Sequence, residues 1–380
     1  MKTRANPRHV PANDFAAQWD SVGASALRAV DRVGKSGWLI LGGEVEAFEK
    51  ELAAFWGLRH AVGCGNGLDA IEIGLRGLGL KKGEKVLTTP LSAFATTLAV
   101  VRAGGVPVFA DVDESGLLDL DLAQDALAKN PGIRFLLPVH LYGHALDLAR
   151  LARLAKKADV LVLEDCAQAI GAKSRGRAVG SVGQAAAVSF YPTKNLGCLG
   201  DGGALLTGSS ELRDKARSLR DYGQTAKYVH SQLGLNSRLD ELHAAILRDA
   251  LLPRLDSFLE KRREVARRYL SDIRNPAITI PPAPEGSASA WHLFPVLVED
   301  RDGFLEHLRG AQIAAGVHYP LLIPDQPAFR GQPPKRLTAL SRAARFAAQE
   351  VSLPIHPFLA RADVDRVIER CNDWKGPCTR

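Results

Sequence analysis

Short apolar runs alternate with amphipathic segments between about residues 60 and 210. Segments 68–78, 95–103 and 146–156 repeat their apolar residues at helical spacing. The apolar runs between them are short enough to be buried strands. Seven such strands are predicted, at residues 61–63, 86–89, 106–110, 135–139, 160–163, 187–190 and 204–207. Strands that alternate with helices are typical of an α/β fold whose mostly parallel sheet is covered on both faces.

The second half of the chain changes character. A helical stretch begins near residue 211, breaks near residue 222 and resumes at Ser237, where a capping-box sequence ends at Asp240. A proline-rich loop at 281–289 then precedes strand-like residues 291–298. These features predict a large domain over residues 1–250, including an N-terminal arm and helix, and a smaller α+β domain over residues 251–380.

The composition of the chain argues against several classes of function. The chain has 380 residues, 46% of them hydrophobic, and a net charge of +7. Its basic residues are scattered and lack interleaved aromatic residues, so nucleic-acid binding is not expected. The five cysteines form no C-x-x-C pair, so neither a disulfide framework nor a metal site is predicted. No uncharged run approaches the length of a membrane span, and a cytoplasmic protein is expected.

One lysine lies in an unusual setting. Lys194 follows the predicted strand that ends at Phe190 and precedes a glycine-rich turn at 197–203. Most lysines are surface residues, but the buried strand, Pro192 and the glycines indicate close approach of backbone and ligand. Asp165 follows another buried strand, and ligands of open α/β sheets bind beyond the carboxyl ends of strands. Pyridoxal phosphate requires this pair, a lysine for a Schiff base and a carboxylate at its ring nitrogen.

A glycine-rich turn between a predicted strand and helix offers backbone N–H groups to a phosphate. The turn consists of Gly65, Asn66, Gly67 and Leu68. The alternative interpretation is a tight turn without a ligand. The spacing of the glycines matches neither a dinucleotide fingerprint nor a P-loop. Ser189 is a second phosphate candidate, and Phe94 is a candidate to cover the cofactor ring. Backbone capping and core packing are the alternatives for those two residues.

The order of these motifs resembles one known family, the DegT/DnrJ/EryC1/StrS group of pyridoxal-phosphate sugar aminotransferases, which have the aspartate aminotransferase-like fold type I. The resemblance covers nearly the whole chain. It is carried by residues 36–42, 46–49, 65–70, 138–143, 164–168, 189–195 and 234–241.

The resemblance implies a homodimer with active sites shared between subunits. Asn236 is then expected to reach the phosphate of the neighbouring subunit, Gln168 to contact the cofactor ring, and Asp165 to contact its nitrogen. Lys194 would hold the cofactor as an internal aldimine, with pyridoxamine phosphate as the intermediate of a ping-pong reaction. Dehydratases of the group carry histidine at this position, so the lysine implies a transaminase.

The sequence at residues 222–228, at His230 and at residues 236–238 is most similar to that of enzymes that act at carbon 3 of nucleotide-linked keto-hexoses. The implied reaction transfers an amino group from L-glutamate to a nucleotide-linked 3-keto-6-deoxyhexose. Amination at carbon 4 or of a cyclitol, and a non-catalytic pyridoxal-phosphate-binding regulator, are the alternatives. The candidate substrate contacts are Lys227, Tyr228, His230, Arg238, His318 and Tyr319, and a surface or interface side chain is the alternative for each of them.

Overall fold

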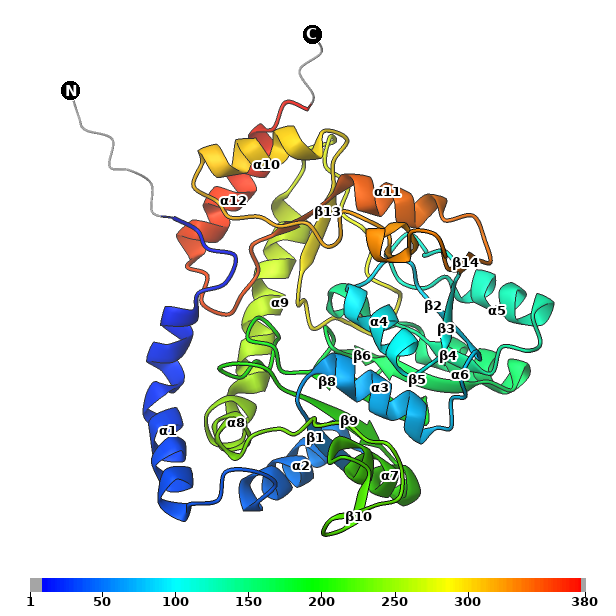
Figure 1. The fold of residues 1–380 in the computed structure, drawn as a ribbon. Coiled ribbons are helices and arrows are strands. Elements are labelled where there is room, and N and C mark those ends of the chain that lie inside the picture. The colour runs from blue at the N-terminus through cyan, green and yellow to red at the C-terminus, as the bar shows by residue number, and fades with distance from the viewer. Residues whose placement is uncertain (1–8, 377–380) are drawn as a thin grey trace.

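A computed structural model describes residues 9–376 of the chain, and its centre is an eight-stranded sheet in the order β1-β9-β8-β5-β4-β2-β3-β14 (Figure 1). The strands are β1 (His60–Cys64), β2 (Lys85–Thr88), β3 (Val106–Phe109), β4 (Phe135–Leu137), β5 (Leu161–Asp165), β8 (Ala185–Ser189), β9 (Gly203–Thr207) and β14 (Lys335–Arg336). Neighbouring strands are parallel except at β9, which is antiparallel to both β1 and β8. All seven predicted strands are confirmed, and β14 is an addition from the C-terminal part.

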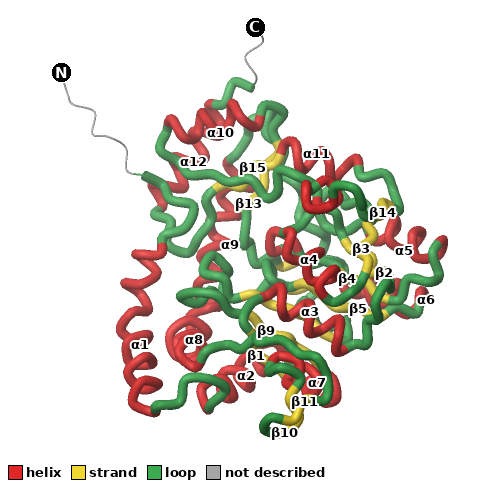
Figure 2. The backbone as a smooth tube through the Cα atoms, viewed as in Figure 1, coloured by secondary structure: helices red, strands yellow, loops and turns green. Residues whose placement is uncertain are grey.

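Helices cover both faces of this sheet, as Figure 2 shows. One face packs against α3 (Gly67–Gly77), α4 (Phe94–Arg102) and α7 (Ser210–Arg220). The other face packs against α2 (Gly43–Trp56), α5 (Leu120–Lys129) and α6 (Leu148–Ala158), while α1 (Phe15–Ser36) joins the same apolar core by packing on α8 (Glu241–Ile246). Successive residues of β5 show the alternation, because Val162 and Leu163 belong to cores on opposite faces. The prediction of an α/β fold is therefore confirmed.

A separate apolar core lies in the C-terminal part, around an antiparallel pair of strands. It contains β13 (Phe294–Leu297), β15 (Glu350–Leu353), α9 (Leu255–Asp272), α10 (Arg301–Gly310) and α12 (Arg361–Asp373), while α11 (Ser341–Gln349) lies between this core and the large sheet. The predicted boundary near residue 250 stays a prediction. Among the described residues, no helix combines the length and the apolar character that crossing a membrane requires.

The remaining elements are short. They comprise α8 (Glu241–Ile246), continued by a π-helical turn (Leu247–Leu251) and a 3₁₀ turn (Leu252–Arg254), further 3₁₀ turns at Leu141–Gly143, Ile323–Asp325 and Pro327–Phe329, and the strands β6 (Lys173–Ser174), β7 (Arg177–Ala178), β10 (Gln224–Ala226), β11 (Val229–His230) and β12 (Ser287–Ala288). Strands β10 and β11 form a hairpin at the lower edge of the molecule in Figure 2.

The capping box predicted at Ser237 is wrong. Helix α8 begins four residues later, and the side chain of its N-cap residue, Asp240, makes no capping hydrogen bond. The Ser237 hydroxyl instead accepts from the Gly65 N–H (3.0 Å) and donates to an Asp69 carboxylate oxygen (2.7 Å). These partners are distant in sequence, so local spacing could not reveal that this serine supports the turn at Gly65.

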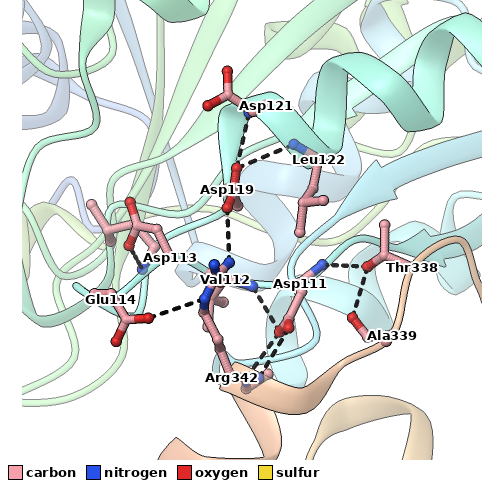
Figure 3. Close-up of polar contacts among 12 residues, drawn as sticks. Asp111, Val112, Asp113, Glu114, Asp119, Asp121, Leu122, Thr338, Ala339 and Arg342 are labelled. Atoms are coloured by element: carbon pink, nitrogen blue, oxygen red, sulfur yellow. Dashed lines mark hydrogen bonds and ion pairs between the residues drawn. The ribbon is translucent and has the colours of Figure 1, made fainter.

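Carboxylates from distant segments cap two helices. Asp111, which follows β3, accepts hydrogen bonds from the N–H groups of Arg342 and Ala343 at the start of α11 (Figure 3). The Arg342 guanidinium pairs in turn with Glu114 (3.1 Å) and Asp119 (3.0 Å). At α2, Glu241 has the same role and accepts from three N–H groups of residues 42–45. Negative charge at a helix N-terminus is stabilising. Because each carboxylate comes from another element, these contacts also join α11 to the large sheet and α8 to α2.

We expect Asp111→Ala to destabilise the protein by about 1–2 kcal/mol, because the first N–H groups of α11 lose their cap and the helix dipole loses its counter-charge. Urea unfolding followed by circular dichroism measures the change. Asp121→Ala is the control, since Asp121 makes an exposed ion pair with Arg150 on a neighbouring helix and should change stability by less than about 0.5 kcal/mol. Equal effects of the two substitutions would contradict the assignment.

Candidate active site

A cavity of about 560 Å³ lies where β5 and β8 end. Asp165 and Ser189, the last residues of these strands, line it together with the start of α3 and the first turn of α4. His292, His318 and Tyr319 line it from the C-terminal part. The cavity thus occupies the place where open α/β sheets bind ligands, at the carboxyl ends of parallel strands.

The Lys194 side chain lines this cavity from the loop after β8. The loop is tightly folded: the Lys194 N–H donates to the Tyr191 carbonyl (2.8 Å), and the Asn195 amide donates to the Ala290 carbonyl (2.8 Å). Within residues 9–376 the amine of Lys194 has no hydrogen-bond or ion-pair partner. Burial lowers the pKa of Lys194 to about 8, against the opposing effect of the Asp165 carboxylate. The amine is therefore available to a ligand, and it loses its proton at a pH not far above neutral.

Asp165 is held in place by two hydrogen bonds. The Thr96 hydroxyl donates to Oδ2 (2.8 Å), and the Ala167 N–H donates to Oδ1 (3.0 Å). The Thr96 hydroxyl is also 2.9 Å from that of Ser92, which fixes its orientation. Burial raises the pKa of Asp165, while these hydrogen bonds and the charge of Lys194 oppose the rise. The carboxyl group is therefore fixed in orientation beside a lysine amine.

The turn before α3 forms a backbone cradle. Asn66 caps the helix, since its Oδ1 accepts from the Asp69 N–H (2.8 Å). A Cβ atom added to Gly67 would lie 2.7 Å from the Ser189 Cβ, so only glycine permits this approach of α3 to β8. Asn66, Gly67, Leu68 and Ser189 all line the cavity, whereas the Gly65 N–H is occupied by a side chain. A helix N-terminus at a close backbone approach favours a bound anion.

Gln168 connects the two parts of the chain across the cavity. Its carbonyl oxygen accepts from the Tyr142 N–H (2.8 Å), and its amide donates to the Tyr319 hydroxyl (3.1 Å). His318 lies beside Tyr319 in the lining. The structure therefore brings together the predicted residues Asp165, Gln168 and Lys194 with the two C-terminal ones.

Other predicted residues lie elsewhere in the described part of the chain. The Phe94 ring contacts the Phe329 ring, with centroids 5.8 Å apart. Arg238 pairs with Asp221 (3.0 Å), and Asn236 is exposed. Lys227, Tyr228 and His230 are exposed on or beside the β10–β11 hairpin. None of these six is part of the lining of the cavity, and their roles stay predictions.

Sequence analysis missed several residues at the site. Thr96, Arg102 and His292 line the cavity, and Ser237 supports the cradle. Thr96 lies two positions after the predicted Phe94 on the same first turn of α4, which is the only local signal for it. The others are brought in by tertiary packing.

A buried cluster of residue types that often bind metals lies next to Asp165. It comprises His140, Glu164 and Cys166, whose ligand atoms are within 4.8 Å of one another. Glu164 already accepts from the His140 ring (2.9 Å) and from three N–H groups of residues 180–183. The Leu146 N–H donates to His140 Nδ1, so Nε2 carries the ring proton. The cluster is a satisfied hydrogen-bond network that supports the end of β5.

Comparison with known proteins gives consistent matches. The sequence profile of the DegT/DnrJ/EryC1/StrS aminotransferase family matches residues 20–372. A dTDP-3-amino-3,4,6-trideoxy-alpha-D-glucose transaminase of Streptomyces venezuelae is 43% identical over 98% of both chains. A pleiotropic regulatory protein of Geobacillus stearothermophilus is 39% identical over 96% of this chain and 98% of its own. A crystal structure of S. venezuelae DesV in complex with a ketimine intermediate superposes with a TM-score of 0.92 at 43% identity, over 96% and 98% of the two chains.

We expect the Lys194 amine to titrate near pH 8 in the ligand-free protein instead of near 10.5, because burial disfavours its charged form. Acetylation of each lysine, followed by mass spectrometry as the pH is raised, measures the midpoint. Asp165→Asn should lower that midpoint further, since the carboxylate stabilises the ammonium. The exposed Lys157 gives the surface reference in the same spectra, and a Lys194 midpoint near 10.5 would contradict the burial argument.

Proposed function

The chain belongs to the DegT/DnrJ/EryC1/StrS aminotransferase family, and from this membership we propose that it transfers an amino group from L-glutamate to carbon 3 of a nucleotide-linked 3-keto-6-deoxyhexose. The chain is thus an aminotransferase, and its family depends on pyridoxal phosphate. The observation that carries the proposal is the unpartnered Lys194 amine beside the fixed Asp165 carboxyl group in one cavity. The sugar assignment is supported by the S. venezuelae transaminase, whose name places the amino group at carbon 3.

The residues of the cavity fit pyridoxal phosphate. Lys194 offers a free amine, Asp165 a carboxyl group for the ring nitrogen, and the cradle formed by Asn66, Gly67 and Leu68 offers N–H donors for the phosphate. Ser189 is a further phosphate donor, and Gln168 a ring contact. The bound cofactor supplies an electron sink for the carbon atom that gains or loses the amino group.

The side chains of the chain itself have three tasks in this reaction. A lysine with a pKa of about 8 exchanges protons readily near neutral pH, so Lys194 Nζ moves the proton to and from the substrate carbon. Asp165, fixed by Thr96 and the Ala167 N–H, keeps a proton on the ring nitrogen. His318 and Tyr319, which line the same cavity, contact the sugar.

A second copy of the chain completes the site in this proposal. The outer side of α1 exposes Phe15, Trp19, Leu27 and Val30, and an apolar groove of about 220 Å³ lies between α1 and Leu199. Exposed apolar surface of this kind marks protein–protein interfaces.

The candidates on and near the hairpin are assigned to the neighbouring cavity. Asn236 reaches the partner's phosphate site, and the cations Lys227, His230 and Arg238, with Tyr228, meet the substrate diphosphate. The four described cysteines are buried and unpaired, which agrees with a cytoplasmic location.

Two alternatives use the same residues. Amination at carbon 4 of the sugar or of a cyclitol needs the same lysine and carboxylate. The other alternative is a non-catalytic regulator that binds the cofactor, and the G. stearothermophilus relative is named a regulatory protein. Such a regulator would bind cofactor at Lys194 without transferring an amino group.

We expect the purified enzyme, incubated with L-glutamate and a panel of nucleotide-linked keto sugars, to aminate 3-keto sugars and to release 2-oxoglutarate. NMR of the products identifies the aminated carbon. Lys194→Ala should reduce the rate by at least about 10²-fold, because it removes the proton-transferring group. Amination at carbon 4 alone would replace the sugar assignment, and no amination of any ketone would favour the regulator.

We expect Leu27→Glu to convert a dimer into a monomer, because it introduces a charge into the apolar face of α1, where Leu27 is 59% exposed. Size-exclusion chromatography with light scattering measures the mass. The matched control is Leu270→Glu on α9, because Leu270 is 47% exposed and is not among the residues that line the groove at α1. A monomeric wild-type protein, or a variant that remains dimeric, would contradict the proposed interface.

A further inference from the structure

Three side chains form a continuous hydrogen-bonded chain from the C-terminal core to the cavity. Glu350, the first residue of β15, is fully buried, and its Oε1 lies 2.5 Å from the Ser352 hydroxyl. The Ser352 Oγ lies 2.9 Å from Nδ1 of His318. His318 lines the cavity that also holds Lys194. A buried carboxyl group is thereby connected to an imidazole ring at the site.

The carboxyl group of Glu350 lacks a counter-ion. Among the described residues no cationic side chain contacts it: the nearby Arg301 donates to the Ala347 carbonyl and pairs with Asp302. Its other oxygen, Oε2, accepts from the backbone N–H of His318 (2.6 Å). Burial raises the pKa of Glu350 to about 8, and the hydrogen bonds from His318 and Ser352 and the charge of Arg301 oppose the rise. A buried acid without a counter-ion retains its proton near neutral pH.

Direct protonation of the ring is unfavourable. Burial, together with the charge of Lys194, lowers the pKa of His318 to about 4. The other titratable groups around it are His292 and Tyr319 in the cavity lining and Tyr142, whose hydroxyl donates to the His318 carbonyl (2.9 Å). An imidazolium ion is therefore excluded near neutral pH, and a proton can reach the ring only as another leaves it.

The chain has two consistent hydrogen-bond patterns. When Glu350 is protonated, its O–H donates to Ser352, the Ser352 O–H donates to His318 Nδ1, and His318 Nε2 carries the ring proton. When Glu350 is ionised, the Ser352 O–H donates to the carboxylate, His318 Nδ1–H donates to Ser352, and Nε2 has a free lone pair. Nε2 has no partner among the described residues, so it is the ring atom available to a ligand.

We propose that Glu350, Ser352 and His318 form a proton relay that delivers a proton from Glu350 to a substrate oxygen at His318 Nε2. The Nε2–H bond breaks as the new O–H bond forms, the Ser352 proton moves to Nδ1, and the Glu350 proton moves to Ser352. The net change is one proton lost by Glu350 and one gained by the substrate oxygen, and the ring stays neutral throughout.

This proposal rests on the proposed function, because it supplies a proton that amination of a ketone consumes. The ketone oxygen leaves as water when nitrogen replaces it, and an oxygen leaves as water only after protonation. The reverse direction returns a proton to Glu350 by the same steps. Lys194 then has to transfer only the proton at the substrate carbon atom.

The relay can be tested in the holoenzyme without any sugar. With ¹⁵N-labelled histidine, the ring nitrogens of His318 should exchange from the Nε2–H to the Nδ1–H tautomer as the pH rises through about 8. Ser352→Ala and Glu350→Gln should each abolish that exchange, whereas Ser352→Thr, which keeps the hydroxyl, should preserve it. A single tautomer at every pH in the wild-type protein would overturn the relay, whatever reaction the enzyme catalyses.

Kinetics give the second readout. With a ketone that the wild-type enzyme aminates, Ser352→Ala should lower kcat by about 10²-fold and convert a curved proton inventory in mixed H₂O and D₂O into a linear one. Ser174→Ala is the matched control, since Ser174 is as buried as Ser352 but lies on β6, outside the site. Equal kcat in the two variants would overturn the relay. Failure of the wild type to aminate any ketone would reject the proposed function and leave the tautomer measurement to decide the relay.

Discussion

Desolvation at the carboxyl ends of β5 and β8 determines the chemistry of this protein. The same burial raises the pKa of Asp165 and lowers that of Lys194, and each charge stabilises the other. Neither residue would have these properties on a solvated surface. The sheet order provides the setting, since it places both strand ends in one cavity and brings α3 and α4 over it.

Hydrogen bonds from other parts of the fold hold the site around Asp165 and Lys194 in position. Glu164 ties the end of β5 to residues 180–183, Thr96 orients Asp165, and Ser237 holds the turn before α3. Gln168 connects the sheet to Tyr319 of the C-terminal part. Each of these contacts is a hydrogen bond between segments distant in sequence, so the site is assembled by tertiary structure around a few residues at strand ends.

The strands of the sheet and the two residues at the centre of the site could be predicted from the sequence, for a physical reason. Buried strands and helices carry local periodicity, and a lysine or carboxylate that follows such a strand can be recognised by its position alone, as with Lys194 and Asp165. Ser237 shows the limit: its local spacing matches a helix cap, but its hydroxyl contacts Gly65 and Asp69. His292 and Glu350 had no local signal, and Thr96 had only its closeness to Phe94 on the first turn of α4, because the roles of these residues depend on which distant atoms lie opposite them.

The short strand β14 has a consequence for how this fold can be rearranged. Lys335 and Arg336 pair with Val108 and Phe109 at the edge of the large sheet, and the contact of Asp111 with α11 follows directly. The C-terminal part is therefore no interchangeable module. A chimaera that exchanges it with that of a relative must carry residues 335–343 together with their matching surface at 108–119, or β14 loses its pairing with β3 and α11 loses its cap.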